Sequence, residues 1–126
     1  MYLSHAARGA GVCVCPTTEA NLGDGLFEVP DFVDQGGRFG VGSDSNVRLS
    51  AADELRTLEY GQRLVRRQRN VLGDARHSTG RLLFEGALAG GAQALGLPVG
   101  AIAPGHRADG HREGADDEDR EGERPE

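Results

Sequence analysis

A five-residue apolar run, GVCVC at residues 11–15, constrains the fold of this chain more than any other feature. Short continuous apolar runs are typical of strands covered on both faces of a parallel sheet. RFGVGSDS at residues 38–45 begins a second such strand, and between them Pro30 can open a short helix that buries Phe32 and Val33 and ends at a glycine pair. Strand, helix and strand within about 30 residues have the size of a βαβ unit. The crossover predicts two parallel strands.

Polar stretches follow both predicted strands directly. PTTEANLGDG at residues 16–25 is typical of a loop, and GSDSN at residues 42–46 follows the second strand. In parallel sheets and barrels, ligands bind beyond the carboxyl ends of the strands. We therefore expect both stretches to open onto one face. The side chains that they bring there are Asp44 from the second stretch and Thr17, Thr18, Glu19 and Asn21 from the first.

Asp44 stands just past the second predicted strand and allows two interpretations. A carboxylate at this position can ligate a metal ion or shuttle a proton. Ser43 and Asp44 can equally form a polar turn without any chemical role. Glu19 and Asp24 leave the same two interpretations open.

Two longer helices complete the predicted α/β fold. Ser50, with Asp53 three positions on, resembles a capping box at the start of the first helix. Thr79 can cap the second, which ends at Gly96. The second helix contains several internal glycines, among them Gly90, so we expect it to depend on close packing.

Charge and length exclude several classes of function. The chain has 126 residues, the size of one ordinary domain. Four arginines crowd residues 63–69, but no aromatic residue is interleaved with them, so we expect no nucleic-acid partner. The sequence contains no signal peptide and no apolar run near the length that spans a membrane. We therefore expect a cytoplasmic protein without a membrane partner.

The C-terminal segment differs from the rest in composition. Residues 107–126 hold nine acidic and four basic side chains and almost no apolar ones, so they carry −5 of the net charge of −6. Such a segment cannot bury enough surface to offset the entropy cost of ordering. We expect a folded part at residues 1–106 and a disordered acidic tail at 107–126. An interaction arm for a basic partner is the alternative.

Cysteine and histidine patterns do not predict a metal site. Cys13 and Cys15 would lie on the same face of a strand, and we expect two buried, reduced thiols rather than a disulfide. The four histidines include no pair at the HxH or HxxxH spacing of metal ligands. We expect them to lie on the surface.

Four blocks in this order carry a family resemblance: CPTTEANLGDGLF, GGRFGVGSDS, DELRTLEYGQRL and ALAGGAQALG. Together they resemble formimidoylglutamate deiminases of the amidohydrolase superfamily, over roughly residues 1 to 109. The resemblance implies a partial TIM-type (β/α) barrel, consisting of the last two βα units and the helix that follows them. It leaves open whether the full-length members of the family form homodimers.

The resemblance implies zinc-dependent hydrolysis of N-formimidoyl-L-glutamate to N-formyl-L-glutamate and ammonia, in histidine degradation. Asp44 matches the aspartate that ends the last barrel strand of the family, where it binds the metal and accepts a proton from water. The polar stretch with Thr17, Thr18, Glu19 and Asn21 would belong to the rim of the pocket for this small-molecule substrate.

This sequence also departs from the family pattern. The histidines that the family carries on its first and middle strands have no counterpart, and Asn46 stands where the family pattern leads us to expect histidine. One aspartate does not hold zinc, so we expect a fragment that is inactive alone. Two alternatives remain: a fragment of another deaminase that acts on a cyclic amidine, and a non-catalytic remnant or interaction module.

Overall fold

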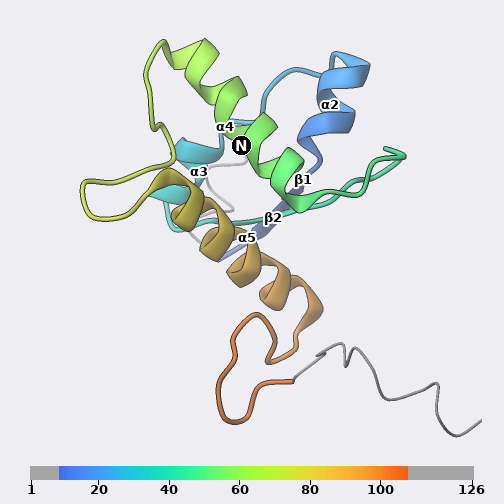
Figure 1. Cartoon of the computed structure of the whole chain (residues 1–126), viewed down its shortest axis with the longest axis vertical. Coiled ribbons are helices and arrows are strands. Elements are labelled where there is room, and N and C mark those ends of the chain that lie inside the picture. Colours follow the sequence, from blue (N-terminus) through green and yellow to red (C-terminus); the bar gives the residue numbers. More distant parts are fainter. Residues whose placement is uncertain (1–8, 108–126) are drawn as a thin grey trace, which may run out of the picture.

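The computed structural model describes residues 9–107 (Figure 1). The elements in chain order are β1 (Gly11–Val14), α2 (Pro16–Leu22), α3 (Val29–Asp34), β2 (Arg38–Val41), α4 (Ala51–Arg66) and α5 (Thr79–Leu95). β1 and β2 pair in parallel, with Val12 opposite Phe39. The predicted βαβ crossover is therefore confirmed, with two short helices in it instead of one. The predicted tail lies, apart from Arg107, outside the described residues.

The stretch after β1, which the sequence predicts to be a loop, is helical over most of its length. Pro16 occupies the first helical position of α2, where its missing N–H needs no partner. The Glu19 carboxylate accepts a hydrogen bond from the Cys15 N–H at 2.8 Å. α2 ends at Gly23, whose φ of 74° lies in the left-handed region. The loop prediction was wrong because these local signals outweigh the small, polar composition.

α3 begins and ends close to its predicted bounds. It buries Val29, Pro30 and Phe32, and the ring of Phe27 meets that of Phe32 edge to face at 5.5 Å between centroids. Val33, which we expected to be buried, is 38% exposed. Val29 takes the place in the core that the sequence assigned to Val33.

The two long helices start at side-chain caps. Ser50 Oγ accepts a hydrogen bond from the Asp53 N–H at 3.2 Å, which confirms the predicted cap of α4. α5 is capped one residue earlier than predicted, because Ser78 Oγ, rather than Thr79, accepts from the Arg81 N–H at 3.3 Å. α5 ends at Gly96, as predicted.

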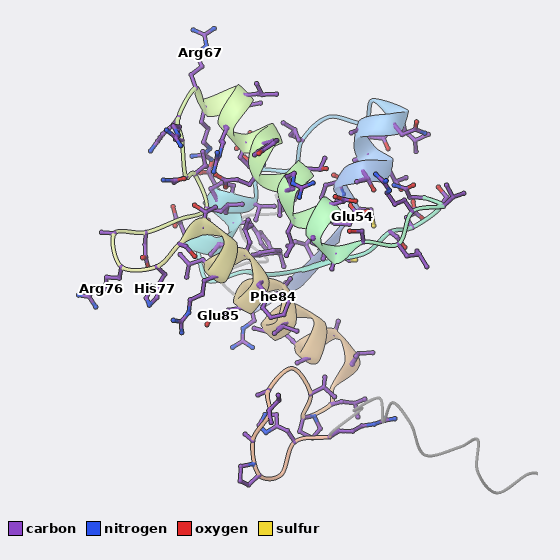
Figure 2. The ribbon with its side chains drawn as sticks, in the orientation of Figure 1. Glu54, Arg67, Arg76, His77, Phe84 and Glu85 are labelled. Atoms are coloured by element: carbon purple, nitrogen blue, oxygen red, sulfur yellow. The ribbon has the colours of Figure 1, made fainter. Side chains whose placement is uncertain are left out.

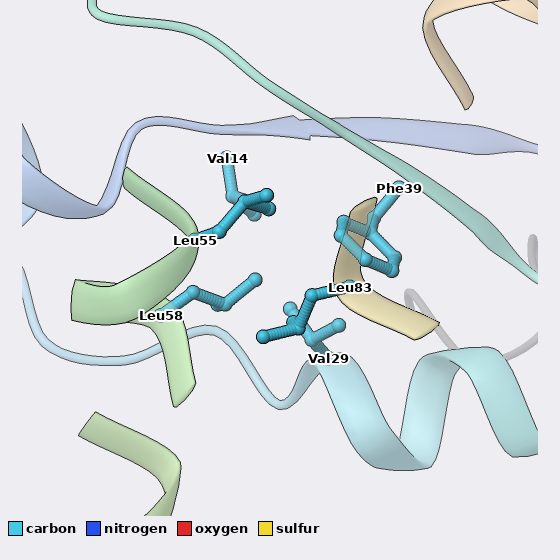
Figure 3. Close-up of a cluster of buried hydrophobic side chains, with 6 residues drawn as sticks. All are labelled: Val14, Val29, Phe39, Leu55, Leu58 and Leu83. Carbon is cyan, nitrogen blue, oxygen red and sulfur yellow. The ribbon is translucent and has the colours of Figure 1, made fainter. Parts of the chain in front are cut away.

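The hydrophobic core lies on one face of the β1–β2 pair, between the strands and the helices α3, α4 and α5 (Figure 3). Its members are Val14, Val29, Phe39, Leu55, Leu58 and Leu83. Because Val14 points into this core, its neighbours Cys13 and Cys15 point to the other face. Cys13 is exposed and Cys15 half-buried, so the expectation of two buried thiols was wrong. α5 approaches this second face at Gly40, where an added Cβ atom would lie 3.5 Å from the Gly91 N, but the Cys13 side chain stays exposed there.

α5 lies directly against the backbone of β2. A Cβ atom placed on Gly90 would come within 1.9 Å of the carbonyl oxygen of Phe39, and one on Gly86 within 2.7 Å of the Phe39 ring. A Cβ atom on Gly91 would meet nothing within 4 Å. The close packing predicted for the glycine-rich helix is therefore confirmed at Gly86 and Gly90.

The described histidines are accessible to solvent. His106 is exposed, and His77 lies in the segment between α4 and α5, where its Nδ1 is 3.0 Å from Asp74 Oδ2 (Figure 2). His5 and His111 lie outside the described residues. In the part of the chain that the structure describes, no helix is long and apolar enough to cross a membrane.

Candidate functional site

The carboxyl ends of β1 and β2 lie side by side and lead into two polar segments. β1 continues into α2, and β2 continues into a turn at residues 43–46 that is closed by a hydrogen bond from the Asn46 N–H to the Ser43 carbonyl at 2.9 Å. The Gly42 N–H donates to the Val14 carbonyl at 3.0 Å and extends the pairing past the strand ends. A cavity of about 390 Å³ lies between the two segments. Its lining residues are Thr17, Thr18, Asn21, Ser45, Asn46 and Val47.

The structure brings three of the five predicted site residues to this cavity. Thr17, Thr18 and Asn21 line it, whereas Asp44 and Glu19 do not. The carboxylate of Glu19 instead caps the start of α2 through its hydrogen bond with the Cys15 N–H. The Asp44 side chain is exposed at the tip of the turn.

Asp44 adopts a backbone conformation that few residue types tolerate. Its φ of 46° lies in the left-handed region, where aspartate and asparagine occur more often than other non-glycine residues. The preceding carbonyl, that of Ser43, accepts a hydrogen bond from Thr18 Oγ1 at 2.9 Å. The buried hydroxyl of Thr18 therefore holds the turn that presents Asp44.

A second connection joins the same turn to α4 through Thr17. Asn46 Nδ2 donates to Thr17 Oγ1 at 2.6 Å, and the Thr17 hydroxyl in turn donates to the Glu54 carboxylate. The Thr17 N–H also donates to Glu54, at 2.9 Å. Figure 2 shows Glu54 on α4, beside α2. One series of hydrogen bonds thus links the turn at residues 43–46 to α2 and α4.

Glu54 was not identified from the sequence. The residue is only 2% exposed, which is rare for a carboxylate without compensating partners. The sequence does carry a sign of this burial. Residues 54, 58 and 62 repeat at a spacing of four, so Glu54 lies on the same side of α4 as the buried Leu58.

We expect Glu54→Gln to lower the free energy of unfolding by about 1–3 kcal/mol, because an amide nitrogen would replace one of two acceptors and leave a Thr17 donor without a partner. Urea unfolding measures the change, and faster hydrogen exchange of the Thr17 amide would locate it. Asp53→Asn is the matched control. Asp53 pairs with exposed arginines, so its loss should cost less than about 1 kcal/mol. Equal losses for the two variants would contradict the role of Glu54.

The electrostatic surroundings of Cys15 show that negative charge gathers at the strand ends. Burial raises the pKa of the Cys15 thiol, and Cys13, Asp44 and Glu19 raise it further. A raised thiol pKa keeps Cys15 protonated at neutral pH. The strand ends therefore carry carboxylates beside the neutral Cys15 thiol.

The described residues do not by themselves fit a zinc ion. Within residues 9–107, no three or more His, Cys, Asp or Glu side chains are arranged to hold a metal. A catalytic zinc site needs three protein ligands and one open position. Asp44 offers one carboxylate.

Comparison with known proteins gives this geometry a family context. Residues 1–110 match the amidohydrolase family. The chain belongs to the amidohydrolase family. Among curated amidohydrolase relatives, formimidoylglutamate deiminase from Pseudomonas aeruginosa is 59% identical over 105 residues. A 5-methylthioadenosine/S-adenosylhomocysteine deaminase from Natronomonas pharaonis is 34% identical over 107 residues.

These relatives are much longer than the matched segment. Each match covers 82% of this chain and 23% of the relative. The crystal structure of an amidohydrolase from Brucella melitensis superimposes with a TM-score of 0.72 and 55% identity, over 75% of this chain and 21% of that one. The chain thus spans about a quarter of the curated relatives. The predicted α/β class is confirmed, and the structural match agrees with a partial amidohydrolase barrel.

Proposed function

We propose that this chain is the Asp44-bearing part of a deiminase that hydrolyses N-formimidoyl-L-glutamate to N-formyl-L-glutamate and ammonia, in histidine degradation. The identity of 59% to formimidoylglutamate deiminase, well above the 34% to the adenosine-type deaminase, carries this proposal. The resemblance to a histidine-degrading enzyme also favours a cytoplasmic location and a small-molecule substrate. Because the chain spans 23% of that relative, we propose that it is inactive alone.

Asp44 is the residue that we propose for proton transfer. Hydrolysis of an amidine adds water to the amidine carbon and releases ammonia, so a base must take a proton from water and the leaving nitrogen must gain one. A carboxylate can do both in turn. Asp44 is exposed at the strand end and is held in its turn through Ser43 and Asn46. The zinc ion that the family resemblance implies would need further ligands from outside residues 9–107.

The cavity beside this turn is the proposed rim of the substrate site. The hydroxyls of Thr17 and Thr18 are engaged within the protein, so we propose that they shape the rim. Asn21 is exposed and lines the cavity, and its amide can donate to a substrate carboxylate. Glu19 acts in this proposal only through the cap that it gives to α2.

A deaminase that acts on a cyclic amidine is the second candidate. The identity of 34% to a 5-methylthioadenosine/S-adenosylhomocysteine deaminase supports it. A non-catalytic interaction module is the third.

Two chimeras distinguish these candidates. In each, the aligned segment of this chain replaces its counterpart, once in the Pseudomonas aeruginosa deiminase and once in the Natronomonas pharaonis deaminase. We expect ammonia from N-formimidoyl-L-glutamate in the first chimera and no deamination of 5-methylthioadenosine by the second. The reverse result would favour the cyclic substrate, and two folded but inactive chimeras would favour the interaction module.

The 126-residue chain alone is the control for both chimeras. We expect it to release no ammonia and, after dialysis, to retain no stoichiometric zinc. One tightly held zinc per chain would contradict the interpretation of the chain as part of a larger site.

A further inference from the structure

Cys13 and Cys15 form a pair of thiols on the face of the sheet opposite the hydrophobic core. They are separated by one residue of β1, so their side chains project to the same side. A Cβ atom placed on Gly42 would lie 3.4 Å from Cys13 Sγ and 3.4 Å from Cys15 Sγ. Both sulfur atoms therefore border the same small space, which is left open because residue 42 has no side chain.

The pair is both accessible and reduced. Cys13 is exposed, Cys15 is half-buried, and neither is in a disulfide. Burial and the hydrogen bond between the two thiols raise the pKa of Cys15 and keep that thiol protonated. The pair lies on the face opposite the core, so a ligand can approach it without displacing Val14 or its neighbours.

We propose that Cys13 and Cys15 form a chelating site for monosubstituted trivalent arsenic compounds, with Gly42 providing the room. Trivalent arsenic with one organic substituent needs only two sulfur ligands, whereas a tetrahedral zinc site needs four ligands in all. The two S–H groups condense with R–As=O. Two As–S bonds form, the arsenic–oxygen bond breaks, and both thiol protons leave with the oxygen as water. Arsenic stays trivalent, so the step needs no oxidant or reductant.

Phenylarsine oxide and the full 126-residue chain test this proposal, since the chain has two cysteines and both belong to the pair. With a phosphine reductant present, we expect intact-mass spectrometry to show one phenylarsenic group per chain. Both thiols should stop reacting with a thiol reagent, and 2,3-dimercaptopropanol should restore them. Arsenic that bridges two chains, or a chain that stays unmodified, would overturn the proposal.

Single substitutions separate chelation from binding at one thiol. Cys13→Ser and Cys15→Ser should each weaken binding by about 10²-fold, because one tethered ligand is lost. Cys13 is exposed, so its replacement leaves the core intact, and circular dichroism verifies the fold. Unchanged affinity in either variant would show that the thiols do not act together.

Gly42→Ala tests the geometry without removing a sulfur. Its methyl group would be in van der Waals contact with both Sγ atoms and would fill the space between them that arsenic needs, so we expect binding to weaken about fivefold. Gly91→Ala, with nothing within 4 Å of its added Cβ, is the matched control and should bind normally. The wild-type chain in urea should also bind more weakly than the folded chain. Equal binding in urea would show that the strand does not preorganise the pair.

Discussion

Asp44→Asn in the Pseudomonas aeruginosa chimera should lower ammonia release by about 10²–10⁴-fold, the range typical for loss of a general acid or base. Asparagine tolerates a left-handed φ at least as well as aspartate, so the turn with φ of 46° should persist. The variant thus removes the charge and the proton acceptor while it keeps the backbone. Initial rates with N-formimidoyl-L-glutamate measure the effect.

Asp24→Asn is the matched control for this experiment. Asp24 is an exposed aspartate that follows α2, and the substitution makes the same chemical change. We expect its activity to stay close to that of the unmodified chimera. If Asp44→Asn leaves the rate unchanged, or if both variants lose activity alike, the catalytic carboxylate has been assigned to the wrong residue.

Gly90→Ala should unfold or severely destabilise the chain, because the new methyl group would lie 1.9 Å from the Phe39 carbonyl oxygen. Overpacking by one methyl group usually costs about 1–3 kcal/mol, and a backbone atom cannot rotate away as a side chain can. We expect the cost to reach the upper end of that range. The free energy of unfolding, measured in urea by circular dichroism, reports it directly.

Gly91→Ala provides the comparison one residue along the same helix. Its Cβ would meet nothing within 4 Å, and alanine favours a helix over glycine by about 1 kcal/mol. This variant should therefore be as stable as the wild type or more stable. A similar loss at both positions would mean that α5 does not contact β2 as closely as described.

Local signals explain which parts of the fold could be predicted. The cap at Ser50, the stop at Gly96 and the parallel pairing of the two strands depend on short stretches of chain and were confirmed. The helix at Pro16–Leu22 was missed because its small polar residues suggested a loop, although Pro16 and Glu19 favour a helix start. Val33 was misplaced because Val29 fills the core instead.

The candidate site could be predicted only in outline. Chain order and strand polarity place Asp44 and Thr17 at the same edge of the sheet, and the structure has them there. The partners of Thr17 depend on how α4 packs, 37 residues further along the chain, so the buried carboxylate of Glu54 was not expected. The assignment of Asp44 to catalysis remains a prediction.

The one-sided core has a consequence for how this chain tolerates mutation over evolutionary time. Substitutions at Val14 or Phe39 disturb packing in any context, because both side chains belong to the core described here. Substitutions at Cys13 disturb packing only if other protein covers the opposite face, since that side chain is exposed in residues 9–107. A comprehensive scan of single variants would therefore show whether other protein covers the face that carries Cys13. Equal intolerance on both faces marks a segment that works inside a larger protein, and free variation at Cys13 marks one that works alone.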